Sequence, residues 1–114
     1  MQTINPNEKR IRELFEELVS IDSVSFSERQ MADCLTKILK EMKFEVSEDS
    51  AGEFYGGNAG NLYGFLKGTG EGTSTLFVAH MDTVHPGASK KAVFHEDGKI
   101  TSDGTTVLGS DDVA

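Results

Sequence analysis

The first third of the chain arranges its apolar and charged positions with the period of a helix. Between residues 7 and 21 the apolar residues recur three and four apart on one face, and charged residues occupy the opposite face. A second stretch with the same spacing follows Ser27, which forms a capping-box pattern with Gln30. The apolar face of this stretch carries Met31, Cys34, Leu35, Ile38, Leu39 and Met42. We therefore expect two amphipathic helices, the second opened by Ser27.

Beyond the second helix the apolar residues follow the period of a strand. Phe44 and Val46 alternate with polar residues and predict one strand, and residues 61–66 predict another. Between them, residues 51–60 are rich in glycine and predict a loop. The run 75–79 is continuously apolar, which is typical of a buried central strand.

The last third of the chain contains a hairpin pattern. Residues 93–95 and 99–101 predict its two strands, and Gly98 takes the turn position that requires a positive φ. The order of elements is thus helix, helix, strand, strand, strand and hairpin. This order predicts the α/β class, with a mixed sheet flanked by helices.

The composition of the chain indicates a globular protein and excludes some classes of binding partner. The 114 residues are enough for one domain at most, and 37% hydrophobic and 26% charged residues are typical of a globular protein. A net charge of −8 argues against nucleic acid and against an anionic membrane surface as partners. The single cysteine, Cys34, cannot form an internal disulfide, and we expect it to be a small core residue. A cytoplasmic location is the expectation that fits these features.

Two groups of metal-ligand type stand out. His80 and Asp82 follow the predicted central strand, at the end where open α/β sheets place ligands. Side chains two apart on a strand share a face and stand roughly 6.5 Å apart. A carboxylate so placed can orient a histidine that binds a metal. Asp111 and Asp112 supply adjacent carboxylates in a glycine-marked loop. Each group alone is weak evidence, because such residues are common at strand ends and in turns.

Together the two groups resemble a known family. The run 80–84 with Pro86 and Gly87, followed by the run 102–112, resembles the opening half of the M20 family of zinc exopeptidases, and most closely its peptidase T and tripeptidase-like branch. By this resemblance His80 binds one zinc ion and Asp111 bridges two. The same resemblance implies that Asp82 is the catalytic-site residue that orients His80, and that the peptide bond between Asp111 and Asp112 is cis.

The resemblance also implies a wider assignment. Residues 1–114 would be the amino-terminal portion of the catalytic, zinc-binding domain, without its remainder and without the lid and dimerisation domain. The complete enzyme would be a homodimer that hydrolyses short peptides with two zinc ions. Its general-base glutamate and remaining ligands are not among these residues. We therefore expect the isolated chain to be inactive, to hold zinc partially or not at all, and to self-associate.

Two alternatives stay open at this point. The chain could be a non-catalytic binding or assembly module that keeps the front half of the fold, or part of a deacylase of the M20 clan. The run 103–106 favours the peptidase. His85 and His95 lie in a predicted turn and in the predicted hairpin, and we expect both to be ordinary exposed residues.

Overall fold

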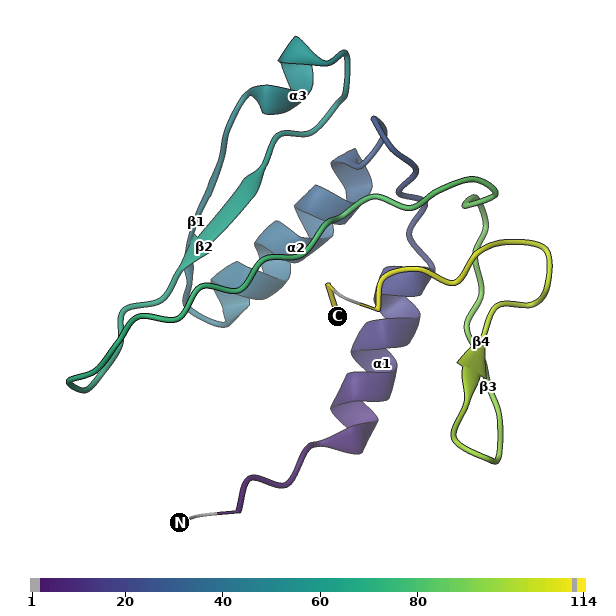
Figure 1. Cartoon of the computed structure of the whole chain (residues 1–114), viewed down its shortest axis with the longest axis horizontal. Coiled ribbons are helices and arrows are strands. Elements are labelled where there is room, and N and C mark those ends of the chain that lie inside the picture. The colour runs from purple at the N-terminus through teal and green to yellow at the C-terminus, as the bar shows by residue number, and fades with distance from the viewer. Residues whose placement is uncertain (1–2, 112) are drawn as a thin grey trace.

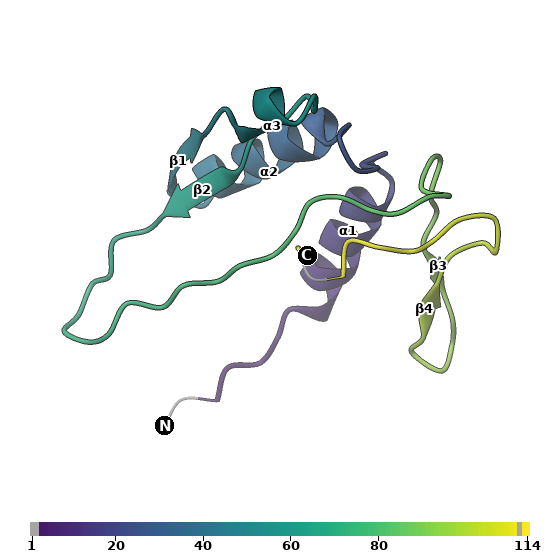
Figure 2. The same ribbon diagram turned by 45° about the horizontal axis from the view of Figure 1, so that its top comes forward.

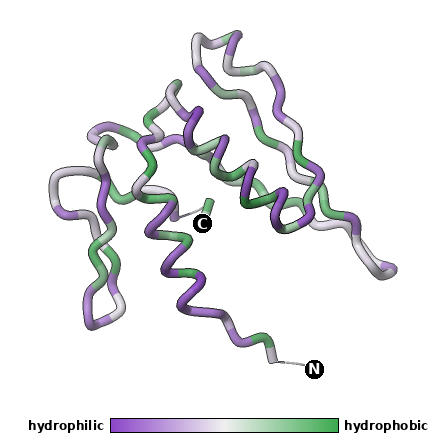
Figure 3. The backbone as a smooth tube through the Cα atoms, turned by 180° about the vertical axis from the view of Figure 1, so that it is seen from behind, coloured by the Kyte–Doolittle hydropathy of each residue, from purple (hydrophilic) through white to green (hydrophobic). Residues whose placement is uncertain are grey.

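Two helices form the centre of the molecule. The structure, a computed structural model, describes residues 3–111 and 113–114 (Figure 1). Helix α1 spans Glu8–Val19 and helix α2 spans Arg29–Glu41, so both predicted helices are confirmed. Figure 3 shows the mixture of hydrophobic and hydrophilic residues along each. Their inner faces supply the buried apolar residues of the described chain, which are Phe15, Leu18, Val19, Met31 and Ala32.

The two helices begin in different ways. At α1 the Asn7 side chain accepts a hydrogen bond of 3.0 Å from the Arg10 amide, a local N-cap. The prediction that Ser27 caps α2 is wrong, because the helix begins at Arg29 without a side-chain cap from its N-cap residue. Instead, the Arg29 amide donates to Asn58 Oδ1 at 3.0 Å. A distant loop therefore satisfies the first turn of α2.

A small sheet covers part of α2 (Figure 2). Strands β1, Glu45–Glu48, and β2, Leu62–Phe65, were both predicted, and the structure pairs them antiparallel. The connection between them was predicted as a loop, but it contains a short helix, α3, at Ala51–Phe54. Asp49 Oδ1 accepts from the amides of Ala51 and Asn61, at 3.0 and 2.7 Å. One carboxylate thus holds both ends of the connection.

The predicted central strand at residues 75–79 is wrong. This stretch has no strand pairing, and Leu76, Phe77 and Val78 are 85%, 90% and 85% exposed. Figures 1 and 2 show it as an extended segment that runs back past α2 from the loop after β2. A strand requires a neighbouring strand for its backbone hydrogen bonds. The described residues provide none here, so the apolar pattern alone does not produce a strand.

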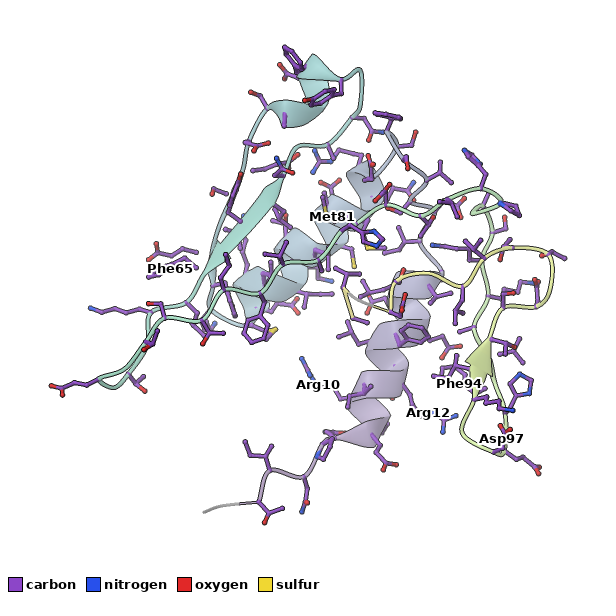
Figure 4. All side chains as sticks on the ribbon, in the orientation of Figure 1. Arg10, Arg12, Phe65, Met81, Phe94 and Asp97 are labelled. Carbon is purple, nitrogen blue, oxygen red and sulfur yellow. The ribbon has the colours of Figure 1, made fainter. Side chains whose placement is uncertain are left out.

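The hairpin is confirmed. Strand β3, Val93–Phe94, pairs antiparallel with β4, Ile100–Thr101, and Gly98 in the turn has a φ of +88°. The Arg12 guanidinium lies over the Phe94 ring, 4.6 Å from its centroid, and so connects the hairpin to α1 (Figure 4).

One parallel contact completes the architecture. Val24, between α1 and α2, forms an isolated parallel bridge with Thr83. The two small sheets are antiparallel, so the described chain combines helices with pairing of both directions, and the α/β class is confirmed. Cys34 is half-buried on α2, with its sulfur 3.8 Å from a carboxylate oxygen of Glu17 on α1. Within the described residues no helix is both long and apolar enough to cross a membrane.

Candidate metal centre

His80 and Asp82 lie against each other. His80 Nδ1 is 2.9 Å from the Asp82 carbonyl oxygen and 3.2 Å from its carboxylate Oδ1. Two oxygens at this nitrogen favour the tautomer with the proton on Nδ1. In that tautomer the lone pair of the ring lies on Nε2, which is the form in which a histidine binds a metal. The His80 side chain is 68% exposed, so the imidazole is open to solvent.

Asp82 is held in place by the loop between α1 and α2. Ser25 Oγ donates to Asp82 Oδ2 at 2.5 Å. On either side of that contact, the Ser25 amide donates to the Thr83 carbonyl at 3.2 Å and the Thr83 amide donates to the Ser23 carbonyl at 2.7 Å. The buried Ser23 hydroxyl also donates to the Met81 carbonyl at 2.7 Å. Residues 23–25 and 81–83 therefore form a clamp that fixes the segment carrying His80 and Asp82, and Figure 4 labels Met81 on this segment.

Sequence reasoning missed Ser25. Its hydroxyl is the direct partner of Asp82, yet the residue lies 57 positions earlier in the chain. Between two amphipathic helices, a serine is expected as a turn or capping residue. The bridge between Val24 and Thr83, which brings this serine to the candidate site, joins distant parts of the sequence and has no local signal.

Asp111 lies in a separate turn. It is exposed, and it follows Gly109 and Ser110, whose φ angles are +67° and +64°. Ser110 is buried, and its hydroxyl donates to the Leu18 carbonyl at 3.4 Å. This contact connects the turn to the end of α1. The bond predicted to be cis, between Asp111 and Asp112, lies outside the described residues.

The structure brings together the first two candidate residues and not all three. Among residues 3–111 and 113–114 no three histidine, cysteine, aspartate or glutamate side chains gather to hold a metal ion. The roles of His80, Asp82 and Asp111 therefore stay predictions. His85 and His95 are exposed, as expected, and His95 Nε2 lies 2.8 Å from the Thr101 hydroxyl within the hairpin.

A second polar cluster is structural. The Arg29 guanidinium forms two hydrogen bonds of 2.8 Å to the two carboxylate oxygens of Glu48, and a third of 2.9 Å to Asp33. The bond from Arg29, with a further one from the Gly60 amide, lowers the pKa of Glu48 to about 2. The cluster joins the start of α2 to β1 and to the loop before β2. It borders a cavity of about 190 Å³ that is also lined by residues of that loop.

Comparison with curated sequences gives one informative relative. No family model matches the chain. The chain is 44% identical over 108 residues to the uncharacterized protein YqjE of Bacillus subtilis. The match covers 95% of this chain and 29% of YqjE. The chain thus spans less than a third of the length of this relative.

Comparison with solved structures gives two close matches. A tripeptidase from Staphylococcus aureus superposes with a TM-score of 0.88 at 38% identity, over 93% of this chain and 28% of the tripeptidase. The aminopeptidase PepT from Bacillus cereus superposes with a TM-score of 0.85 at 42% identity, over the same shares of the two chains. Both the backbone and the sequence of the described chain therefore match part of each of these proteins.

Proposed function

Because this chain belongs to the peptidase family of the tripeptidase and the PepT aminopeptidase that it matches, we propose that it forms part of a metal-dependent site for the hydrolysis of short peptides. The α/β fold is that of a portion of a peptidase catalytic domain. The substrate class follows the names of the two solved relatives. A dimeric complete enzyme and a cytoplasmic location stay predictions from the family resemblance.

One observation carries the proposal. Asp82 turns both its carbonyl and its carboxylate toward His80 Nδ1, at 2.9 and 3.2 Å, and Ser25 fixes the other carboxylate oxygen. This is the arrangement that orients a histidine whose second nitrogen binds a metal. An imidazole nitrogen and an aspartate oxygen are also donors that suit zinc. The donor set therefore fits the metal that the family resemblance implies.

Each residue has a defined part in this proposal. His80 Nε2 and the Asp111 carboxylate would hold metal, and Asp82 would keep the imidazole in the correct tautomer and orientation. A pair of zinc ions that share a carboxylate supplies an activated water and a polarised carbonyl for peptide hydrolysis. A catalytic zinc usually has about three protein ligands. His80 and Asp111 provide fewer, so we propose that further ligands and the general base come from other residues of the complete enzyme.

Zinc titration of the chain tests the proposal. His80→Ala should abolish binding, because it removes a ligand. Asp82→Asn should weaken binding by about 10-fold to 100-fold, the usual effect of losing the partner of a ligating histidine. His95→Ala is the matched control, since His95 is another exposed histidine and lies in the hairpin, and it should bind zinc as the unaltered chain does. Equal affinity of the His80→Ala and His95→Ala variants would reject His80 as a ligand.

A further inference from the structure

Lys90 is a buried lysine whose amine has no hydrogen-bond partner among the described residues. The residue is only 2% exposed, and its Nζ makes no hydrogen bond. Lysines are rarely buried without a partner, because the ammonium loses its hydration. Burial accordingly lowers the pKa of Lys90, and the negative charge of Asp22 opposes part of this effect. Asp22 itself accepts a hydrogen bond of 2.7 Å from the Ser89 amide. Because burying the Lys90 ammonium costs free energy, we expect its position to serve particular contacts.

The Lys90 amine lies near Gly109, in the turn before Asp111. A Cβ atom at Gly109 would lie 3.8 Å from Lys90 Nζ and only 2.6 Å from Thr83 Cγ2. The face of Gly109 that would carry a side chain therefore lies against the Thr83 methyl group and near the Lys90 amine, with no room for a side chain. Its φ of +67° is also one that glycine adopts readily.

These contacts join the two halves of the candidate site. Thr83 directly follows Asp82 and is held by the clamp through its amide and carbonyl. Gly109 lies two residues before Asp111. Thr83 is itself buried, and its hydroxyl has no hydrogen-bond partner among the described residues. The Lys90 amine and the Thr83 hydroxyl are thus two buried polar groups at the contact between residues 81–83 and the turn at 109–111.

We propose that Lys90 is a positioning residue, which together with Thr83 supports the turn at residues 109–111 and so sets the place of Asp111 relative to His80. The proposal rests on the proposed function, because it assigns Lys90 to the geometry of that metal site. It differs from a purely structural role in what its removal does. Replacing an unpaired buried charge by an apolar side chain of similar length is neutral or stabilising for a fold. Removing a positioning residue, in contrast, changes the geometry of the metal site even when the free energy of unfolding stays the same.

Lys90→Met tests this distinction, with Lys91→Met as the control. Both changes remove one positive charge, but Lys91 is exposed. We expect Lys90→Met to leave the free energy of unfolding equal or higher and to lower zinc affinity at least tenfold. Lys91→Met should change neither. Gly109→Ala, which places a methyl group at this same contact, should also lower zinc affinity.

Amide hydrogen exchange gives a readout that needs no metal. In the metal-free chain, Lys90→Met should speed exchange at residues 109–111 by roughly tenfold, since the turn loses its support, while Lys91→Met should not. Unchanged exchange and unchanged zinc affinity in Lys90→Met would overturn the proposal. Unfolding of this variant would also overturn it, because Lys90 would then support the whole chain. If no variant of the chain binds zinc, hydrogen exchange alone decides the role of Lys90, while equal zinc affinity of the His80→Ala and His95→Ala variants rejects the proposed function.

Discussion

Ser25 donates a hydrogen bond of 2.5 Å to the Asp82 carboxylate across 57 positions of sequence. The serine lies between the two helices, and the aspartate lies beside the candidate metal ligand His80. The loop between α1 and α2 therefore fixes the position of the Asp82 carboxylate. Its neighbours Ser23 and Thr83 add backbone hydrogen bonds that fix the same register.

Removal of the Ser25 hydroxyl should loosen Asp82 and weaken zinc binding. We expect Ser25→Ala to lower zinc affinity severalfold and the free energy of unfolding by about 1 kcal/mol, the typical net value of one hydrogen bond. Isothermal titration and urea unfolding measure the two quantities. Ser20→Ala removes a hydroxyl whose one hydrogen bond among the described residues is to the Glu17 carbonyl at the end of α1, and it should leave zinc affinity unchanged. Identical zinc affinities for the two variants would show that Ser25 does not control Asp82.

The pair of Arg29 and Glu48 should make stability depend on acid pH. The pKa of Glu48 is lowered to about 2 from a usual value near 4.5, so the folded state favours the ionised carboxylate. The resulting stability is present above about pH 4.5 and is lost as the pH falls toward 2. Glu48→Gln should lower the free energy of unfolding at pH 7 by about 1 kcal/mol and lose less stability on acidification.

Urea unfolding at pH 7, 4 and 3 measures this dependence. Glu45→Gln on the same strand is the control, since Glu45 is exposed and makes no ion pair among the described residues. Asp49 also has a pKa lowered to about 2, by hydrogen bonds from the Ala51 amide first and from Asn61. The Glu48→Gln variant should therefore keep part of the acid sensitivity. A pH dependence identical to that of the unaltered chain would contradict the role of Glu48.

The entry into β2 should not tolerate a side chain at Gly60. A Cβ atom there would lie 1.8 Å from the Asp49 carbonyl oxygen, so the backbone must move. We expect Gly60→Ala to lower the free energy of unfolding by about 1–3 kcal/mol, as in other overpacked sites. Gly68→Ala is the control, because a Cβ atom at Gly68 meets no atom within 4 Å. Thermal unfolding of both variants measures the difference, and equal melting temperatures would disprove the close approach.

The extended segment at residues 75–79 should promote self-association. Leu76, Phe77 and Val78 expose their side chains, and the segment has no strand neighbour among the described residues. We expect sedimentation velocity to show oligomers, and Phe77→Ser to shift the distribution toward monomer. Phe54→Ser is the control, because Phe54 is 84% exposed but its backbone belongs to α3. A monomeric unaltered chain at high micromolar concentration would contradict this prediction.

The sequence predicted the elements that depend on local pattern. The spacing of apolar residues located α1 and α2, and Gly98 located the hairpin turn, because both features are determined by residues close in sequence. The start of α2 was misplaced because its first amide bonds to Asn58, which no local pattern indicates. The strand predicted at 75–79 was wrong because an apolar run of this kind forms a strand only beside a neighbouring strand, and the described residues provide none.

In the candidate site, too, local spacing predicted some contacts and could not predict others. The spacing of His80 and Asp82 indicated that their side chains could meet, and they do so at 3.2 Å, although the strand on which that prediction was based is absent from the described residues. The contributions of Ser25 and Lys90 depend on contacts across long stretches of sequence, so no spacing rule could find them. A buried lysine in a loop has the same sequence signature as an exposed one.

The clamp between residues 23–25 and 81–83 has a consequence for biosynthesis. Its hydrogen bonds join residues at least 57 positions apart, so on a nascent chain they can form only after Thr83 has left the ribosome. By then the segments of both helices and of the β1–β2 pair have been synthesised, and local contacts of this kind form fastest. We therefore expect the candidate metal site to be among the last parts of this region to assemble. Until the clamp closes, the loop between the helices lacks these hydrogen bonds.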